Sequence, residues 1–203
     1  MVLKEACVGN YNEAYEAQCR GAHRIELCDN LAEGGTTPSY GTLKACKQQL
    51  DIPSMVMIRP RGGNFCYSEE EIKIMLSDIE ICKTIGLEGV VFGVLTPENM
   101  IDMKQMRLLI SAAKPLQVVF HMAFDQIENQ SEALEQLISL GVDRVLTKGG
   151  SSSAMDGAAQ IKSLLVQANG RIAILAGGGV NAGNYEEIIR LTGVTEVHGT
   201  RIV

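Results

Sequence analysis

Two short segments near the N-terminus of this 203-residue chain each place a carboxylate two residues before a thiol. Glu5 precedes Cys7 in "KEAC", and Glu26 precedes Cys28 in "RIELC". In a strand, residues two apart lie on the same face, so each segment would turn an acid and a thiol to one side. Thiolates are the ligands that soft ions such as Cu(I) prefer, but free cysteines also pack in ordinary cores. Metal binding and packing both account for the two thiols.

A second group of polar residues could act on a small anionic molecule. Arg59 and Arg61 of "IRPRGG" carry planar guanidinium donors that match a carboxylate or a phosphate. His121 could exchange protons near neutral pH, with Glu26 or Asp125 as its partner. The alternative is structural: Glu26 and Arg59 would neutralise one another as a buried pair, and His121 would be a hydrogen-bonded core residue.

Two glycine segments could bind an anion through backbone N–H groups. Gly149 and Gly150 follow one predicted strand in "RVLTKGG", and Gly178 and Gly179 follow the next in "GGGV". N–H groups at helix starts are common anion sites, and the usual phosphate site of an α/β barrel follows its last two strands. Tight turns between strand and helix explain the same glycines almost equally well.

Short segments rich in Val, Ile and Leu alternate with longer amphipathic segments along the whole chain, as in parallel sheets covered by helices. Eight such strand–helix repeats in a single domain over residues 1–203 predict an α/β fold, a (β/α)8 barrel of the TIM type. A doubly wound open sheet is the alternative. The predicted strands are residues 2–7, 24–28, 54–59, 89–94, 117–122, 144–148, 171–176 and 196–200.

Local signals predict where several helices begin and end. Capping-box spacings start helices after Asn10 and after Ser68. The Thr–Pro pairs at 37–38 and 96–97 predict two further helix starts, because proline is favoured at the first helical position. Gly86 predicts a helix end.

In such a barrel the functional groups gather at the C-terminal ends of the strands. Thr147 is predicted to point inward, which would turn Lys148 away from the mouth and disfavour a Schiff-base role for Lys148. Met55 and Met57 would add sulfur ligands if they face inward. Alternation predicts that the inward set also includes Glu5, Cys7, Glu26, Cys28, His121 and His198.

The sequence ends three residues after the last predicted strand, so the barrel is expected to lack its eighth helix. The outer face of that strand, around Val197, then needs another cover. A partner subunit is the expected cover, because bare apolar faces attract partners. A truncated chain is the alternative explanation.

Composition restricts the class of partner and the compartment. The formal net charge of -6 argues against a general nucleic-acid binder. No apolar run approaches a membrane span, and the N-terminus lacks a signal-peptide pattern, so a cytoplasmic location is expected. The six cysteines include no CxxC pair, and in a reducing compartment free thiols are expected.

Long segments of the chain resemble the CutC copper-homeostasis family. The resemblance rests on "RIELCDNLAEGGTTPS", "MIRPRGGNFCYS", "VFGVLT", "FHMAFD", "RVLTKGG" and "GGGV", which occur in the family's order over nearly the whole chain. It implies a cytoplasmic (β/α)8 barrel, usually a homodimer, that is linked to copper tolerance and binds Cu(I). The family's suspected copper ligands match Cys7 and Cys28. No agreed enzymatic reaction accompanies the family.

Three departures from the family pattern bear on the anion hypothesis. Met122 stands where the family usually has Arg, Lys148 replaces a small residue, and the ending "GTRIV" is shorter than usual. Two functions are therefore carried forward: a CutC-like protein that binds Cu(I), and a barrel enzyme acting on a small phosphorylated or carboxylated substrate. A scaffold that works through its dimer surface is a third. The expected ligands are a copper ion or a small anion, with neither nucleic acid nor membrane as a partner.

Overall fold

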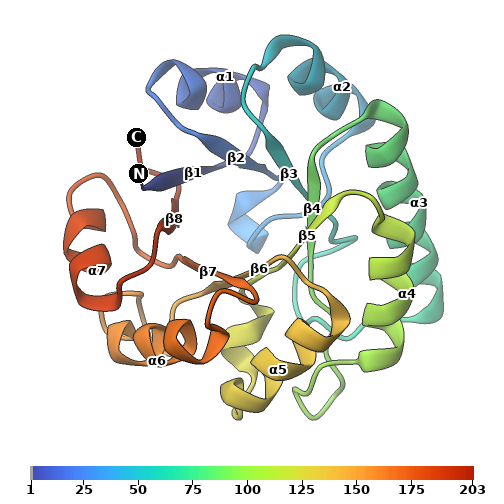
Figure 1. The fold of residues 1–203 in the computed structure, drawn as a ribbon. Coiled ribbons are helices and arrows are strands. Elements are labelled where there is room, and N and C mark those ends of the chain that lie inside the picture. The colour runs from blue at the N-terminus through green and yellow to red at the C-terminus, as the bar shows by residue number, and fades with distance from the viewer. Residues whose placement is uncertain (1) are drawn as a thin grey trace.

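Eight parallel strands pair in chain order, and β8 returns to β1 to close a barrel (Figure 1). The computed structural model describes residues 2–203. Each predicted strand overlaps the observed one, so the predicted (β/α)8 barrel is confirmed. The strands are β1 (Leu3–Val8), β2 (Arg24–Leu27), β3 (Ser54–Met57), β4 (Gly89–Phe92), β5 (Gln117–Phe120), β6 (Arg144–Thr147), β7 (Ala173–Ala176) and β8 (Glu196–Gly199).

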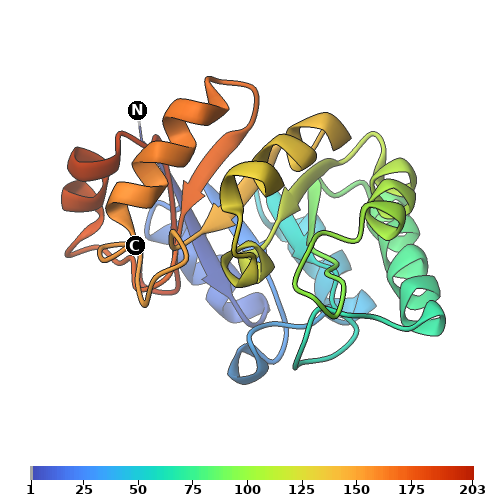
Figure 2. The same ribbon diagram turned by 90° about the horizontal axis from the view of Figure 1, so that it is seen from below.

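The helices form an outer layer around the strands, as the two views show (Figures 1 and 2). Two short 3-10 helices, η1 (Leu31–Glu33) and η2 (Met122–Gln126), lie in the loops that follow β2 and β5. In the described part of the chain, none of the helices is long and apolar enough to cross a bilayer. The α-helices are α1 (Tyr11–Cys19), α2 (Tyr40–Gln49), α3 (Glu69–Ile85), α4 (Met103–Ala113), α5 (Gln130–Leu140), α6 (Ala158–Ala168) and α7 (Tyr185–Thr192).

Apolar side chains fill two separate regions. The larger region lies between the strands and the helices, and the smaller one lies inside the barrel. Met55 and Met57 belong to the inner region, so they do face inward. Leu146 also belongs to it, and the prediction that Thr147 points inward is therefore wrong. The inner region consists of Cys28, Met55, Met57, Val91, Val119, Leu146 and Leu175.

The helix starts predicted after Asn10 and after Ser68 are confirmed. The Asn10 side chain accepts from the Glu13 N–H at the start of α1. Ser68 and Glu71 form a complete capping box at the start of α3. Gly86 ends α3 in the left-handed conformation, with φ 82°, which glycine adopts without steric cost.

Both Thr–Pro predictions are wrong, because each threonine serves a loop. The Thr37 hydroxyl accepts from the Arg59 N–H, and α2 starts instead after Ser39. Thr96 closes a turn, and α4 starts later, after Asp102. The Thr–Pro pair is thus a turn signal here rather than a helix start.

The barrel covers its last strand without an eighth helix. Within residues 2–203 no helix follows β8, yet Val197 is fully buried, and so is Ile202 in the segment after β8. The Lys4 ammonium group lies 4.3 Å from the centre of the Tyr185 ring and links β1 to α7. The C-terminal end of the chain lies in the space between α7 and α1 (Figure 1). The expectation that Val197 needs a partner subunit as cover is therefore wrong.

Candidate functional site at the barrel mouth

Strand β1 lies between β2 and β8, which carry Glu26 and His198. Cys7 is level with Glu26 of β2, and Glu5 is level with His198 of β8. Since neighbouring strands lie roughly 4.8 Å apart, these pairs come into contact through their side chains. Cys28 follows two residues after Glu26, so the two thiols are not level in the barrel, contrary to the expectation.

The Glu26 carboxylate lies between the two thiols and the imidazole. The Cys7 Sγ donates to Glu26 Oε2 over 3.3 Å, and the Cys28 Sγ lies 3.6 Å from the same oxygen. His198 Nε2 is 3.6 Å from that oxygen as well. One ligand atom each from Cys7, Glu26 and His198 lies within 4.8 Å of the other two. The inward orientation predicted for these four side chains is confirmed.

His198 is the residue that sequence reasoning underused. Alternation placed it inside the barrel but gave it no role. Its importance comes from closure, because β8 pairs with β1 and brings His198 beside Glu5 across nearly the whole sequence. The sequence contained this information, because in a closed barrel the last strand pairs with the first, so an inward histidine on β8 lies beside the inward residues of β1.

Burial and contact shift the protonation of the acid and the thiols. Burial raises the pKa of Glu26 well above its usual value. The neighbouring Cys28 thiol holds the pKa of Cys7 well below the usual value of a thiol, and Cys7 in turn raises the pKa of Cys28. The lowered pKa of Cys7 favours its thiolate, which is the reactive form of a cysteine.

Glu5 and His198 stabilise each other's charge. Burial by itself would lower the pKa of His198, but the charge of Glu26 and the hydrogen bonds with Cys7 and Glu5 outweigh it and raise that pKa well above its usual value. Burial likewise opposes ionisation of Glu5, yet the hydrogen bond with His198 and the charge of Arg24 bring its pKa to about 2. Both groups are therefore charged at neutral pH.

A row of ion pairs continues from Glu5 into the barrel interior. Arg24 contacts Glu5 and also lies 2.8 Å from Glu196, which in turn lies 2.6 Å from Arg144. These groups are buried or nearly so, and breaking such a pair leaves a costly uncompensated charge. The acids in the barrel thus pair with Arg24 and Arg144, not with Arg59 as expected.

Arg59 holds loops together. Its Nη1 donates to the carbonyls of Glu33 and Gly35 over 2.7 and 2.8 Å, and its Nη2 donates to the carbonyl of Gly63 over 2.7 Å. The expected Glu26–Arg59 pair is replaced by these backbone contacts. The Arg59 Nε is buried without a partner among the described residues.

Arg61 also has partners within the chain. Its Nε lies 2.5 Å from Glu71, the capping residue of α3, and its Nη2 donates to the Cys66 carbonyl over 2.7 Å. The guanidinium carbon lies 5.2 Å from the centre of the Tyr67 ring. In this conformation Arg61 braces the loop between β3 and α3 rather than reaching into the mouth.

His121 is a buried imidazole with one free nitrogen. Its Nδ1 accepts from the Ala123 N–H over 3.2 Å, and its Nε2 has no partner among residues 2–203. The ring packs on Phe65 with 4.6 Å between centres. Burial, helped by the charge of Arg59, lowers the pKa of His121 to about 3. His121 is therefore neutral, and Asp125 does not pair with it.

Asp125 occupies the N–H groups of the loop after β6. Its carboxylate accepts from the Thr147 hydroxyl over 2.6 Å and from the N–H groups of Lys148 and Gly150 over 3.0 and 2.8 Å. The Gly149 N–H donates to the Thr147 hydroxyl. A carboxylate of the chain itself thus lies where an external anion was expected at Gly149 and Gly150.

The glycines after β7 form a tight turn. Gly178 and Gly179 have φ values of 89° and 79°, a region that favours glycine. The Gly178 carbonyl accepts from Ala154, and the Gly179 carbonyl accepts from the Asn184 side chain over 2.9 Å. Their carbonyls are thus used within the fold, and anion binding by their N–H groups stays a prediction.

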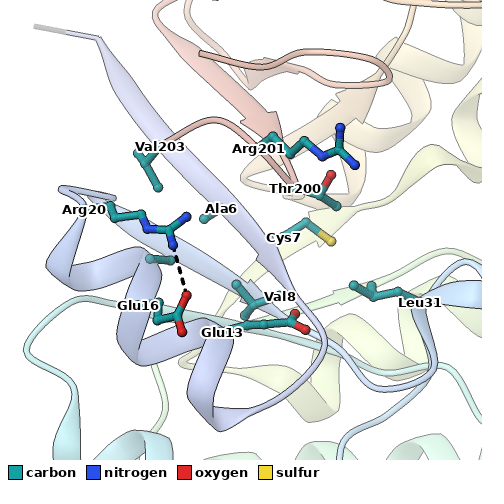
Figure 3. A pocket seen from close by; sticks show the side chains of 11 residues that line it. Ala6, Cys7, Val8, Glu13, Glu16, Arg20, Leu31, Thr200, Arg201 and Val203 are labelled. Atoms are coloured by element: carbon teal, nitrogen blue, oxygen red, sulfur yellow. Dashed lines mark hydrogen bonds and ion pairs between the residues drawn. The ribbon is translucent and has the colours of Figure 1, made fainter.

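Two pockets reach Cys7. One, of about 220 Å³, lies at the mouth of the barrel and is also lined by Glu26, His121 and His198. The other, of about 330 Å³, opens between β1, α1 and the segment after β8 (Figure 3). The Cys7 sulfur points toward the side on which Leu31 lies (Figure 3). The thiol can thus be approached from the mouth and from the side.

Comparison with known proteins gives one consistent family. The sequence profile of the CutC family matches residues 2–203. The human "Copper homeostasis protein cutC homolog" is 48% identical over 196 residues, covering 97% of this chain and 72% of the human protein. A CutC family protein from Enterococcus faecalis is 44% identical over 209 residues and aligns along the full length of both chains.

Solved structures agree with the fold. CutC from Streptococcus agalactiae superimposes with a TM-score of 0.96 at 44% identity, covering all of both chains. A deoxyribose phosphate aldolase from Aeropyrum pernix superimposes with a TM-score of 0.73 at 12% identity, covering 98% of this chain and 86% of the aldolase. At that identity the aldolase shares the fold alone.

Proposed function

This chain belongs to the CutC family, and from that premise we propose that it serves copper homeostasis in the cytoplasm by binding Cu(I) through Cys7 and Cys28. The observation that carries the proposal is the contact of both thiols with one oxygen of Glu26. Two sulfurs on neighbouring strands can share one soft ion, and thiolates are what Cu(I) prefers. Copper would be cargo here, held and passed on.

The surroundings of the two sulfurs suit a soft ion. Met57 lines the same mouth cavity as Cys7 and could add a thioether, which is a further soft ligand. The lowered pKa of Cys7 supplies a thiolate, the form of cysteine that binds metal. Cys28 is buried, so an ion held there would be shielded from water and oxidants.

A competition titration tests the ligand pair. Reduced protein is titrated with Cu(I) against a chromophoric chelator under anaerobic conditions. The double variant Cys7→Ser plus Cys28→Ser should lose most of the affinity. The matched control is Cys19→Ser plus Cys66→Ser, which removes two thiols outside the barrel interior and should keep wild-type affinity. Equal affinity of all three proteins would eliminate the proposed pair.

A second candidate function is an enzyme that acts on a small phosphorylated or carboxylated molecule. It is favoured by the mouth cavity, where the unpartnered Nε2 of His121 and the carboxyl of Glu26, with its raised pKa, both line one space. Perturbed acids in a cleft mark functional sites. Crystals soaked in phosphate or in small carboxylates should then show density in this cavity. An empty cavity at high anion concentration would argue against the enzyme.

We further propose that the protein is a homodimer, as the family resemblance implies. Sedimentation velocity at micromolar concentration should show a dimer mass. A monomer at every concentration would contradict this expectation. The result bears on assembly only, because the copper site and the mouth cavity both lie within one chain.

A further inference from the structure

We propose that Cys7, Glu26 and His198 form a binding site for a borderline divalent cation of the zinc class, with an open fourth position toward the mouth cavity. The site shares Cys7 with the proposed copper pair but leaves out Cys28 and does not rest on the copper proposal. Cysteine, histidine and carboxylate are the three ligand types that Zn²⁺ accepts in proteins.

Two of the three distances between ligand atoms match a tetrahedral ion. With bonds of about 2.0 to 2.3 Å, the ligand atoms of a tetrahedral zinc site lie about 3.3 to 3.7 Å apart. Cys7 Sγ and Glu26 Oε2 are 3.3 Å apart, and His198 Nε2 and Glu26 Oε2 are 3.6 Å apart. All three ligand atoms lie within 4.8 Å of one another. Little movement would be needed to bring them around one ion.

Glu5 orients the histidine as metal-binding histidines are usually oriented. The Nδ1 of His198 lies 2.8 Å from Glu5 Oε1, which fixes the ring and leaves Nε2 to face Glu26 and Cys7. Such a carboxylate–histidine contact is the common support of a metal ligand. Arg24 contacts Glu5 in turn, so the supporting carboxylate is itself held in place.

A divalent cation would balance the charge of the buried network once His198 gives up its Nε2 proton and binds the ion as a neutral imidazole. In that state the carboxylates of Glu5, Glu26 and Glu196 exceed the guanidinium groups of Arg24 and Arg144 by one. Ionisation of the ligand thiol adds a second negative charge. A divalent cation would cancel both charges, whereas a monovalent ion would leave one uncompensated in a buried region, where such charges are costly.

Two features point to a vacant coordination position. Glu26 Oε1 is buried and has no hydrogen-bond partner among the described residues, so it can turn to a ligand without losing a contact. Cys7, Glu26 and His198 all line the cavity of about 220 Å³ at the mouth. Three protein ligands with an open fourth position facing a cavity are the arrangement of reactive rather than structural zinc sites. A water molecule or an oxygen atom of a small ligand would complete the coordination.

The test is the affinity of reduced protein for Zn²⁺, measured by competition with a chromophoric chelator. His198→Gln removes one of the three proposed ligands. Because losing only the hydrogen-bond partner of a ligand costs up to about 100-fold in affinity, this variant should weaken binding by about 100-fold or more. The matched control is His23→Gln, because His23 is exposed outside the barrel interior. Cys28→Ser should leave zinc affinity nearly unchanged while weakening Cu(I). Loss of zinc affinity in Cys28→Ser equal to that in His198→Gln would overturn the assignment.

X-ray absorption at the zinc edge of the wild-type protein tests the ligand set without any variant. The expected shell is one sulfur at about 2.3 Å with nitrogen and oxygen neighbours at about 2.0 to 2.2 Å. Two sulfurs, or wild-type affinity in His198→Gln, would overturn the proposal. The copper proposal fails separately, when Cys7→Ser plus Cys28→Ser keeps its Cu(I) affinity, so the two failures are distinguishable.

Discussion

His198 Nδ1 lies 2.8 Å from Glu5 Oε1 inside the barrel, and both side chains are almost completely buried. The pair joins the first strand to the last and connects the mouth to the ion pairs deeper in the barrel. A buried ion pair contributes little net stability, but removing one member leaves the other charge unpaired and destabilises the fold strongly. Glu5 is therefore expected to matter for stability and for the charge on His198.

Glu5→Gln should lower the unfolding free energy by about 3 to 5 kcal/mol, because it leaves Arg24 and His198 without their shared carboxylate. A carboxyl with its pKa lowered to about 2 stabilises the fold above pH 4.5, and loses this effect as the pH falls toward 2. A histidine with a raised pKa stabilises it below pH 6.5, and loses this effect as the pH rises through the folded-state pKa.

The difference between wild type and Glu5→Gln should therefore be greatest between pH 4.5 and 6.5, where both effects are present. Urea unfolding at several pH values measures it, and NMR titration should show a lower pKa for His198 in the variant. Glu135→Gln, which breaks an exposed pair with Arg171, is the control and should change stability little. A difference that does not vary with pH would contradict the assignment of charge.

Arg59→Met tests the role of Arg59 as a loop brace. Three backbone carbonyls would lose a charged donor, but only the contact with Gly35 is fully buried. Since an unsatisfied buried group costs about 1 to 3 kcal/mol, the unfolding free energy should fall by about that amount in chemical denaturation. Arg20→Met removes an exposed partner of Glu16 and should change it by less than about 0.5 kcal/mol. A small change in the unfolding free energy of Arg59→Met would contradict the role as a loop brace and favour Arg59 as an anion ligand.

Asp125→Ala should turn the loop after β6 into an anion site. The variant frees the N–H groups of Lys148 and Gly150, so acetate should raise its melting temperature above that in chloride at equal ionic strength. Wild type should show no such difference, because its own carboxylate fills the position. Asp156→Ala, an exposed acid, is the control. Equal stabilisation of wild type by acetate would show that Gly149 and Gly150 bind external anions beside Asp125.

Alternation along strands predicted most of the site, but it could not fix the phase of every strand. Glu5 with Cys7, and Glu26 with Cys28, had to share a face, and the structure turns that face inward. In "RVLT" each face carries an apolar residue, because Leu146 packs inside the barrel and Val145 packs outside it. Hydrophobicity could not tell the two faces apart there, so Thr147 was misplaced.

Contacts made by loops could not be predicted from spacing. Arg59 ends among backbone carbonyls of two loops, and the Thr37 hydroxyl is used by the Arg59 N–H instead of a helix. Such contacts depend on the path that the loops take in space, and the spacing of residues in the sequence does not predict that path. The expectation about Val197 failed for a similar reason, because Ile202, in the short segment after β8, is buried in the same core cluster.

Gly89 and Met55 lie level on neighbouring strands and share one space inside the barrel. A Cβ at Gly89 would overlap the Met55 sulfur and lie 3.0 Å from the Gln117 carbonyl. Gly89→Ala should therefore lower the unfolding free energy by about 1 to 3 kcal/mol, the usual cost of overpacking. Met55→Val removes the sulfur, so the double variant should be more stable than the sum of the single effects predicts.

The coupling in this double-mutant cycle should lie between about 0.5 and 3 kcal/mol, measured by urea unfolding of all four proteins. Gly41→Ala is the control, because Gly41 lies exposed in α2 and an added Cβ would meet only the Ser39 hydroxyl, at 3.9 Å. There alanine should stabilise the protein by up to about 1 kcal/mol, since glycine is a poor helix former. Additive effects at Gly89 and Met55 would mean that the Gln117 carbonyl, not the methionine, excludes a side chain at this position.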